Sequence, residues 1–134
     1  MGWVDEEMEG LNVKDKRIKA RVTKVLESIA KSPQSSLPQS CLGWSDTLAA
    51  YRLFDNDAVR SDDLIQPHQE ATEQRIRASE SDVILCIQDT TELDFKGKQI
   101  QGLGRLSYET QRGMYLHPTL CVTPERLSLG IADC

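Results

Sequence analysis

The stretch that decides the fold is VILCIQDTTELDF, from Val83 to Phe95. Its first part, Val83 to Ile87, is a continuous apolar run, which is typical of a strand covered on both faces. Gln88 and Asp89 follow directly, so the strand ends on an acid. Two interpretations are open. Asp89 either makes a local hydrogen bond that ends the strand, or it is held on a rigid scaffold because it takes part in chemistry.

Upstream of this strand the pattern is helical. A helix is predicted from Asp15 to Lys31, with Asp15 as its cap and Ser32-Pro33 as its end. Its apolar residues recur at the spacing of one helix face: Ile18, Val22, Val25 and Ile29.

Two further helices are predicted before the strand. One begins near Ser45, with Ser45 as its cap, and ends at the FDND turn, residues 54–57. The other runs from Ser61 to Ala78 and carries acids in its first turn, which the helix dipole favours. Pro67 lies inside it and is expected to kink the helix or split it in two.

Downstream of Phe95 the pattern is that of strands and turns. Four glycines fall between Lys96 and Gly113, which predicts a long loop or loose hairpin. Strands are predicted at Met114–Val122, with Pro118 near an edge or bulge, and at Leu127–Ala132. Helices followed by antiparallel strands predict an α+β fold.

The overall composition bounds the class of protein. The chain has 134 residues, a net charge of −5 and no apolar run near the ~20 residues that cross a bilayer, so a cytoplasmic protein without a membrane partner is expected. Cys86 and Cys121 lie inside apolar runs and are expected to be small buried residues of a reduced compartment, with a disulfide as the lesser alternative.

One segment departs from this acidic average. Residues 13–31 contain seven lysines and arginines against two acids, a local charge of about +5. On a helix, most of these side chains lie off the apolar stripe and face solvent, so a polyanion would meet one basic surface. A solvated amphipathic face without a binding role is the alternative.

The ordered series of motifs resembles the cut-and-paste transposases of the bacterial insertion-sequence-four family, to which the transposon Tn-five enzyme is related. The segments that carry the resemblance are KDKRIKAR, SLPQSCLGWSDTLAAYRLFDND, QDTTELDF with the following GLG, GMYLHPTLCVTPE and LSLGI. They span nearly the whole chain in the family's order. Two positions depart from the family's usual pattern: Arg126 stands in place of glycine and Ser128 in place of proline.

The resemblance implies two domains. Residues 1–78 would be a helical domain that binds double-stranded DNA at transposon ends, and residues 79–134 would begin an RNase H-like catalytic core with its first three strands. Asp89 would be the first metal-binding acid of a site that holds two Mg²⁺ ions and catalyses phosphodiester cleavage and strand transfer. The family's second Asp and its Glu would lie downstream of Cys134. The implied chain is therefore truncated, inactive by itself and without tightly bound Mg²⁺.

The resemblance also assigns DNA contacts. Arg17 and Arg21 fall on the matched pattern, and Arg52 falls in AYRLF. Tyr51 is expected in the core, and Trp3 and Trp44 are expected to anchor helix packing. Four lysines follow by charge and would contact phosphates: Lys14, Lys16, Lys19 and Lys24.

Three functions remain open. The first is the front part of a transposase that binds transposon ends. The second is a free-standing DNA-binding regulator of transposition, which self-associates or pairs with full-length enzyme. The third is an unrelated small α+β protein.

Overall fold

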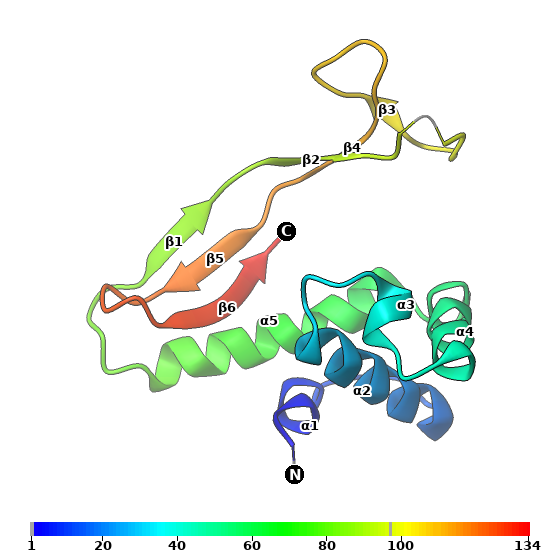
Figure 1. Cartoon of the computed structure of the whole chain (residues 1–134). Coiled ribbons are helices and arrows are strands. Elements are labelled where there is room, and N and C mark those ends of the chain that lie inside the picture. Colours follow the sequence, from blue (N-terminus) through cyan, green and yellow to red (C-terminus); the bar gives the residue numbers. More distant parts are fainter. Residues whose placement is uncertain (1, 97) are drawn as a thin grey trace. The chain divides into compact units, whose positions relative to one another are not determined.

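The computed structural model describes residues 2–96 and 98–134 (Figure 1). Within them, helices precede strands, so the α+β class predicted from the sequence is confirmed. The chain divides into a helical unit, Met1–Ala71, and a strand unit, Thr72–Cys134. The helices are α1 (Trp3–Glu7), α2 (Lys16–Lys31), α3 (Leu37–Ser40), α4 (Trp44–Phe54) and α5 (Ser61–Ala78). The strands are β1 (Leu85–Gln88), β2 (Thr91–Asp94), β3 (Gly104–Arg105), β4 (Arg112–Leu116), β5 (Thr119–Val122) and β6 (Ser128–Asp133).

Helix α2 is the central element of the helical unit, and its prediction is confirmed. The Asp15 carboxylate caps it by accepting the backbone N–H of Arg17 at 2.8 Å. The helix stops at Ser32, directly before Pro33. Its apolar face packs against α1 and α4 in one core. The fully buried members of that core are Val4, Met8, Leu11, Val22, Val25, Ala50 and Leu53.

The other two helix predictions need correction at particular residues. The cap of α4 is Gly43, not Ser45, which lies inside the helix. Gly43 has φ +153°, a conformation that glycine adopts without steric cost, so the chain enters α4 two residues earlier than expected. Helix α5 is not split at Pro67, which is buried within one continuous helix. None of the helices in the described part of the chain has the length and apolar character of a membrane span.

The strand unit contains two small antiparallel sheets. One has the order β1-β5-β6 and the other β2-β4-β3. Strand β1 pairs with β5 from Leu85 opposite Val122 to Gln88 opposite Thr119. The predicted strand at Met114–Val122 is therefore two strands, because the chain leaves one sheet and enters the other at His117-Pro118, where proline supplies no ladder donor.

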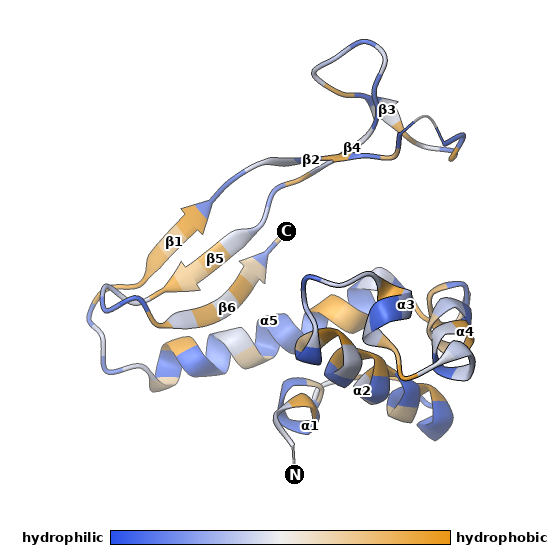
Figure 2. Ribbon diagram, in the orientation of Figure 1, coloured by the Kyte–Doolittle hydropathy of each residue, from blue (hydrophilic) through white to orange (hydrophobic). Residues whose placement is uncertain are grey.

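The sequence predicted that the apolar strand β1 would be covered on both faces. This prediction is wrong. All four of its residues are exposed, including Leu85 (44%) and Ile87 (51%), although Figure 2 colours most of the strand as hydrophobic. The buried residues of this sheet are Cys121 on β5 and Leu129 on β6. Cys121 lies on the middle strand of the sheet, and Leu129 lies on the edge strand, where Arg75 of α5 donates from Nε to the Leu129 carbonyl at 2.5 Å.

Strand β2 lies in a segment for which the sequence predicted no strand, whereas β3 forms a short hairpin with β4 inside the predicted loop or loose hairpin of residues 96–113. Their sheet depends on Gly113, the residue of β4 that pairs with Asp94 on one side and Gly104 on the other. A Cβ at Gly113 would lie 1.8 Å from the Leu93 carbonyl oxygen, so no side chain fits there. Glycine thus permits a close backbone approach at this point rather than marking a loop.

The connection between β5 and β6, residues 123–127, is a tight turn closed by two backbone hydrogen bonds. The Arg126 N–H donates to the Thr123 carbonyl and the Thr123 N–H to the Leu127 carbonyl, both at 2.9 Å. Arg126 has φ +70°, a left-handed conformation in which a loop of this kind favours glycine. Arg126 thus stands in place of the glycine that the resemblance implies, at a position where the backbone conformation favours glycine.

Candidate nucleic-acid interface

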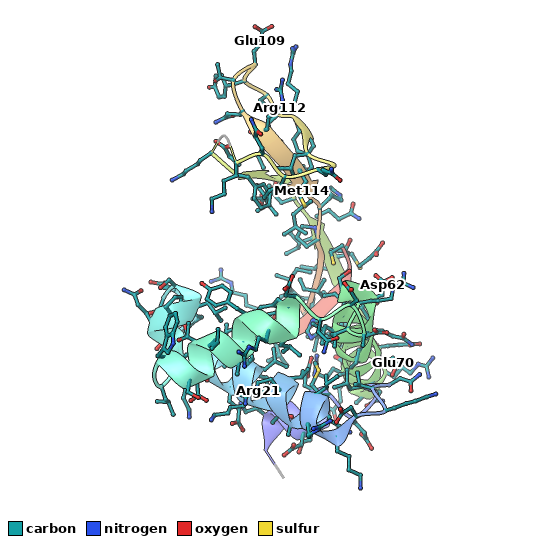
Figure 3. All side chains as sticks on the ribbon, turned by 90° about the vertical axis from the view of Figure 1, so that its right-hand side faces the viewer. Arg21, Asp62, Glu70, Glu109, Arg112 and Met114 are labelled. Carbon is teal, nitrogen blue, oxygen red and sulfur yellow. The ribbon has the colours of Figure 1, made fainter. Side chains whose placement is uncertain are left out.

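A basic groove lies between α2 and α4 in the helical unit. Its volume is about 490 Å³, and three arginines line it: Arg17, Arg21 and Arg52. Arg17 and Arg21 are one helical turn apart on α2, so their guanidinium groups reach the same side, and Arg52 approaches from α4. Figure 3 shows Arg21 on α2. The remaining lining residues are Asp15, Ile18, Ala49, Leu53 and Asn56. The three arginines predicted as DNA contacts thus meet at one place.

One acid partly neutralises this surface. The Asp46 carboxylate, at the start of α4, accepts hydrogen bonds from Lys24 Nζ at 2.7 Å and from the Arg21 guanidinium at 3.5 Å. The hydrogen bond from Lys24 is the main reason that the pKa of Asp46 lies below its ordinary value, while desolvation opposes this shift. Asp46 therefore stays charged at neutral pH and holds two of the predicted cations against α4.

Arg17 is paired within its own turn. Its guanidinium lies 3.1 Å from the Asp15 carboxylate, and its side chain is 92% exposed. The side-chain hydrogen bond from Arg17 is the main cause that lowers the pKa of Asp15. An exposed pair of this kind is weak, so Arg17 can turn toward a phosphate at little cost.

The four predicted lysines differ in place from the arginines. Lys14, Lys16 and Lys19 are exposed and do not belong to the lining of the groove. Lys24 is about half exposed and bound to Asp46. The predicted arginines thus line the groove, and the predicted lysines do not.

The sequence predicts Tyr51 in the core and Trp3 and Trp44 as anchors of helix packing, but all three residues are at least half exposed. Trp44 is 77% exposed, Trp3 56% and Tyr51 50%. Tyr51 lines a second hollow of about 500 Å³ with Leu48, Arg52, Phe54 and Asp55. Arg52 borders both hollows. The signal in the sequence was the adjacency of Tyr51 and Arg52 in AYRLF, but burial of a helical aromatic residue depends on its partners and not on its neighbours in sequence.

Asp89 lies in the strand unit, in the two-residue connection between β1 and β2, and is exposed. Its Oδ1 accepts the N–H of Thr90 at 2.9 Å. Thr90 Oγ1 in turn lies 2.6 Å from Nδ1 of His117 on the neighbouring chain segment. The local hydrogen bond that the sequence analysis kept open is thus present. It does not exclude a metal-binding role, because a carboxylate accepts several bonds.

Magnesium does not fit the described residues by themselves. It requires several oxygen ligands at fixed positions. Among residues 2–96 and 98–134, no three His, Cys, Asp or Glu side chains gather in a group that could hold a metal ion. Asp89 is therefore a single carboxylate rather than a site.

Comparison with known families gives a match, and it covers the helices that line the groove. Residues 1–59 match the family described as transposase DNA-binding. The match supports a transposase N-terminal region with DNA as its partner. The matched segment contains every residue that was predicted to contact DNA. Asp89 and all the strands lie outside it. No curated protein matches the chain.

Proposed function

We propose that this chain is the N-terminal part of a DDE cut-and-paste transposase of the insertion-sequence-four family, and that its helical unit binds transposon-end DNA through the groove between α2 and α4. One observation carries the proposal: the arginine-lined groove lies within the residues that match the transposase DNA-binding family. The match does not distinguish between transposase families, so the particular family rests on the resemblance of the downstream motifs, from QDTTELDF to LSLGI.

Binding proceeds through phosphates. The guanidinium groups of Arg17, Arg21 and Arg52 match two phosphate oxygens each and can straddle a DNA backbone that enters the groove. The surrounding lysines raise the local concentration of DNA and set its orientation, and they carry no sequence information. Tyr51, which lines a hollow together with Arg52 and is half exposed, provides a flat apolar surface for contact with sugars or bases.

The strand unit is the proposed start of an RNase H-like core. Two features support it: the antiparallel order β1-β5-β6, and the position of Asp89 directly after β1. In the complete enzyme Asp89 would be one of the carboxylates that hold Mg²⁺, and the metal would activate the attacking oxygen. Because the described residues gather no group of three metal ligands, we expect this chain by itself to bind Mg²⁺ weakly and to cleave no DNA.

The test is a binding titration by gel shift with the terminal repeats of the parent element and with random duplex of equal length. We expect a preference for the repeats and an affinity that falls steeply with salt. Replacing Arg17, Arg21 or Arg52 by alanine should weaken binding and lower the salt slope by about 1 each. Arg60→Ala is the matched control, since Arg60 is 77% exposed in the same unit but lies outside the groove.

Equal binding of both duplexes with unchanged salt slopes in the arginine variants would overturn the proposal. Cleavage is tested separately, with supercoiled plasmid that carries the repeats. Magnesium-dependent nicking by the purified chain that Asp89→Ala abolishes would show that the described residues do suffice for catalysis.

A DNA-binding regulator is the second candidate. The observation that favours it is that the matched residues belong to the DNA-binding part, while the described residues gather no group of three metal ligands. Such a chain would occupy transposon ends or pair with full-length transposase. It is recognised by a dose-dependent fall in transposition when the chain is added to full-length enzyme, and by the loss of that effect in Arg21→Ala.

A further inference from the structure

Two cysteines lie directly opposite each other in the sheet β1-β5-β6. Cys86 on β1 is the register partner of Cys121 on β5, and Figure 1 shows these strands side by side. Opposite residues of antiparallel strands direct their side chains to the same face, with Cα atoms about 4.5–5.5 Å apart. That separation lies within the range of about 4.4–6.8 Å that disulfides span. The backbone therefore needs no rearrangement to bring the two sulfurs together.

The side chains also interact as thiols. Burial is the main cause that raises the pKa of the Cys121 thiol, and a hydrogen bond and charge interaction with Cys86 add to it. Both cysteines are free. The two Sγ atoms are thus neighbours in the reduced protein.

Access to the two sulfurs is unequal. Cys86 is exposed, against the expectation from its apolar run, whereas Cys121 is only 1% exposed, as expected. A reagent in solution therefore reaches the Cys86 thiol first, because the Cys121 thiol is buried. This is the arrangement of an attacking thiol with a resolving thiol at its side.

We propose that Cys86 and Cys121 form a dithiol site that reacts with low-molecular-weight disulfides, such as oxidised glutathione, and closes an intramolecular disulfide between β1 and β5. The Cys86 thiolate attacks one sulfur of the reagent and releases the first thiolate. The Cys121 thiolate then attacks Sγ of Cys86 and releases the second. Two electrons pass from the protein to the reagent, and the two cysteine protons end on the sulfurs of the reagent, which leaves as two thiols.

The remaining cysteines are not part of this pair. Cys41 belongs to the helical unit, and Cys134 follows the last residue of β6. The product links the strands three residues before Asp89, in the part of the chain that we assign to the start of the catalytic core. The proposed disulfide requires only the register between β1 and β5, so it does not depend on whether the helical unit binds DNA.

The experiment exposes the full chain to oxidised glutathione, alkylates the remaining thiols with iodoacetamide, and reads intact mass and a peptide map. We expect the four free thiols to fall to two, with one cross-linked peptide that joins Cys86 to Cys121. The double variant Cys41→Ser/Cys134→Ser should still close the disulfide completely. Cys86→Ser should leave Cys121 reduced, and it is a safe substitution because the side chain of Cys86 is exposed.

Two results would overturn the proposal. One is a glutathione adduct that persists on Cys86 beside an unreacted Cys121. The other is a map in which Cys86 links to Cys134, to Cys41 or to a second chain. The melting temperature provides an independent check: a native pair should raise the Tm on oxidation, and dithiothreitol should reverse the rise. An oxidised chain with a lower Tm would mean that the sulfurs are not opposed in the folded strands.

Discussion

The helical unit and the strand unit bury their apolar residues to different degrees. Seven apolar residues of the helical unit form one fully buried cluster. In the strand unit the most apolar segment, β1, is exposed at every residue, and the buried apolar residues of this unit are Leu106, which follows β3, Cys121 on β5 and Leu129 on β6. An apolar segment is therefore buried only where other helices or strands pack against it. The partners of α2 are nearby helices, whereas those that would cover β1 are not found among the described residues.

The largest expected effect contrasts two leucines. Leu53→Ala removes a side chain that is 5% exposed in the helical core and should cost about 2–5 kcal/mol of unfolding free energy. Leu85→Ala on β1, at 44% exposure, should change it by about 0.5 kcal/mol or less. Urea unfolding followed by far-UV circular dichroism measures both. Equal losses would mean that β1 is covered in solution, for example by a second copy of the chain.

The next effect breaks one sheet of the strand unit. Gly113→Ala places a methyl group on the Leu93 carbonyl oxygen, and this overlap should cost about 1–3 kcal/mol or more. Amide hydrogen exchange should show lost protection across β2 and β4, with α2 unchanged. Gly104→Ala on the paired strand β3 is the control, because an added Cβ meets no atom within 4 Å there and Gly104 is not among the glycines of positive φ. Unchanged protection in Gly113→Ala would contradict the β2–β4 pairing.

A smaller gain is expected at the turn between β5 and β6. Arg126→Gly relieves the left-handed strain at φ +70°, worth roughly 1–2 kcal/mol, and gives back about 0.5–1 kcal/mol in backbone entropy. The net result should be a rise in stability of up to about 1 kcal/mol, measurable as a higher Tm. Arg126→Ala keeps the strain and removes the same charge, so it separates conformation from electrostatics. A rise of equal size in both variants would assign the effect to charge.

The smallest effect concerns Asp46. Its depressed pKa contributes stability that is fully present at neutral pH and is lost as the pH falls through that pKa, below the ordinary range of aspartate. Asp46→Asn should remove this part of the acid dependence in pH-resolved melting curves. The variant also releases Lys24 and Arg21 from their pairs, so DNA affinity should rise by at most about fivefold at low salt. If the loss of stability at low pH is the same in Asp46→Asn as in the unchanged chain, then the ion pairs of Asp46 with Lys24 and Arg21 do not persist in solution.

The sequence predicted the helical unit well because its signals are local. Apolar spacing and the Asp15 cap located α2 to within a residue, and the three arginines it singled out do meet in one groove. It failed where long-range packing decides the outcome. Trp44 and Tyr51 are exposed because no partner in the unit covers them, and Pro67 is held within one continuous helix. Strand β2 was missed because its pairing with β4 depends on a glycine at which the two backbones approach closely.

By itself, then, the sequence determined the positions of α2, α4 and α5, the boundary between helices and strands, and the basic surface of residues 13–31, because helix signals and charge are properties of short segments. Tertiary structure decided which arginines share a groove, which apolar residues are buried, and that Cys86 stands opposite Cys121. These depend on the register between strands and the contacts between helices, which join residues far apart in the chain and leave no periodic trace in the sequence.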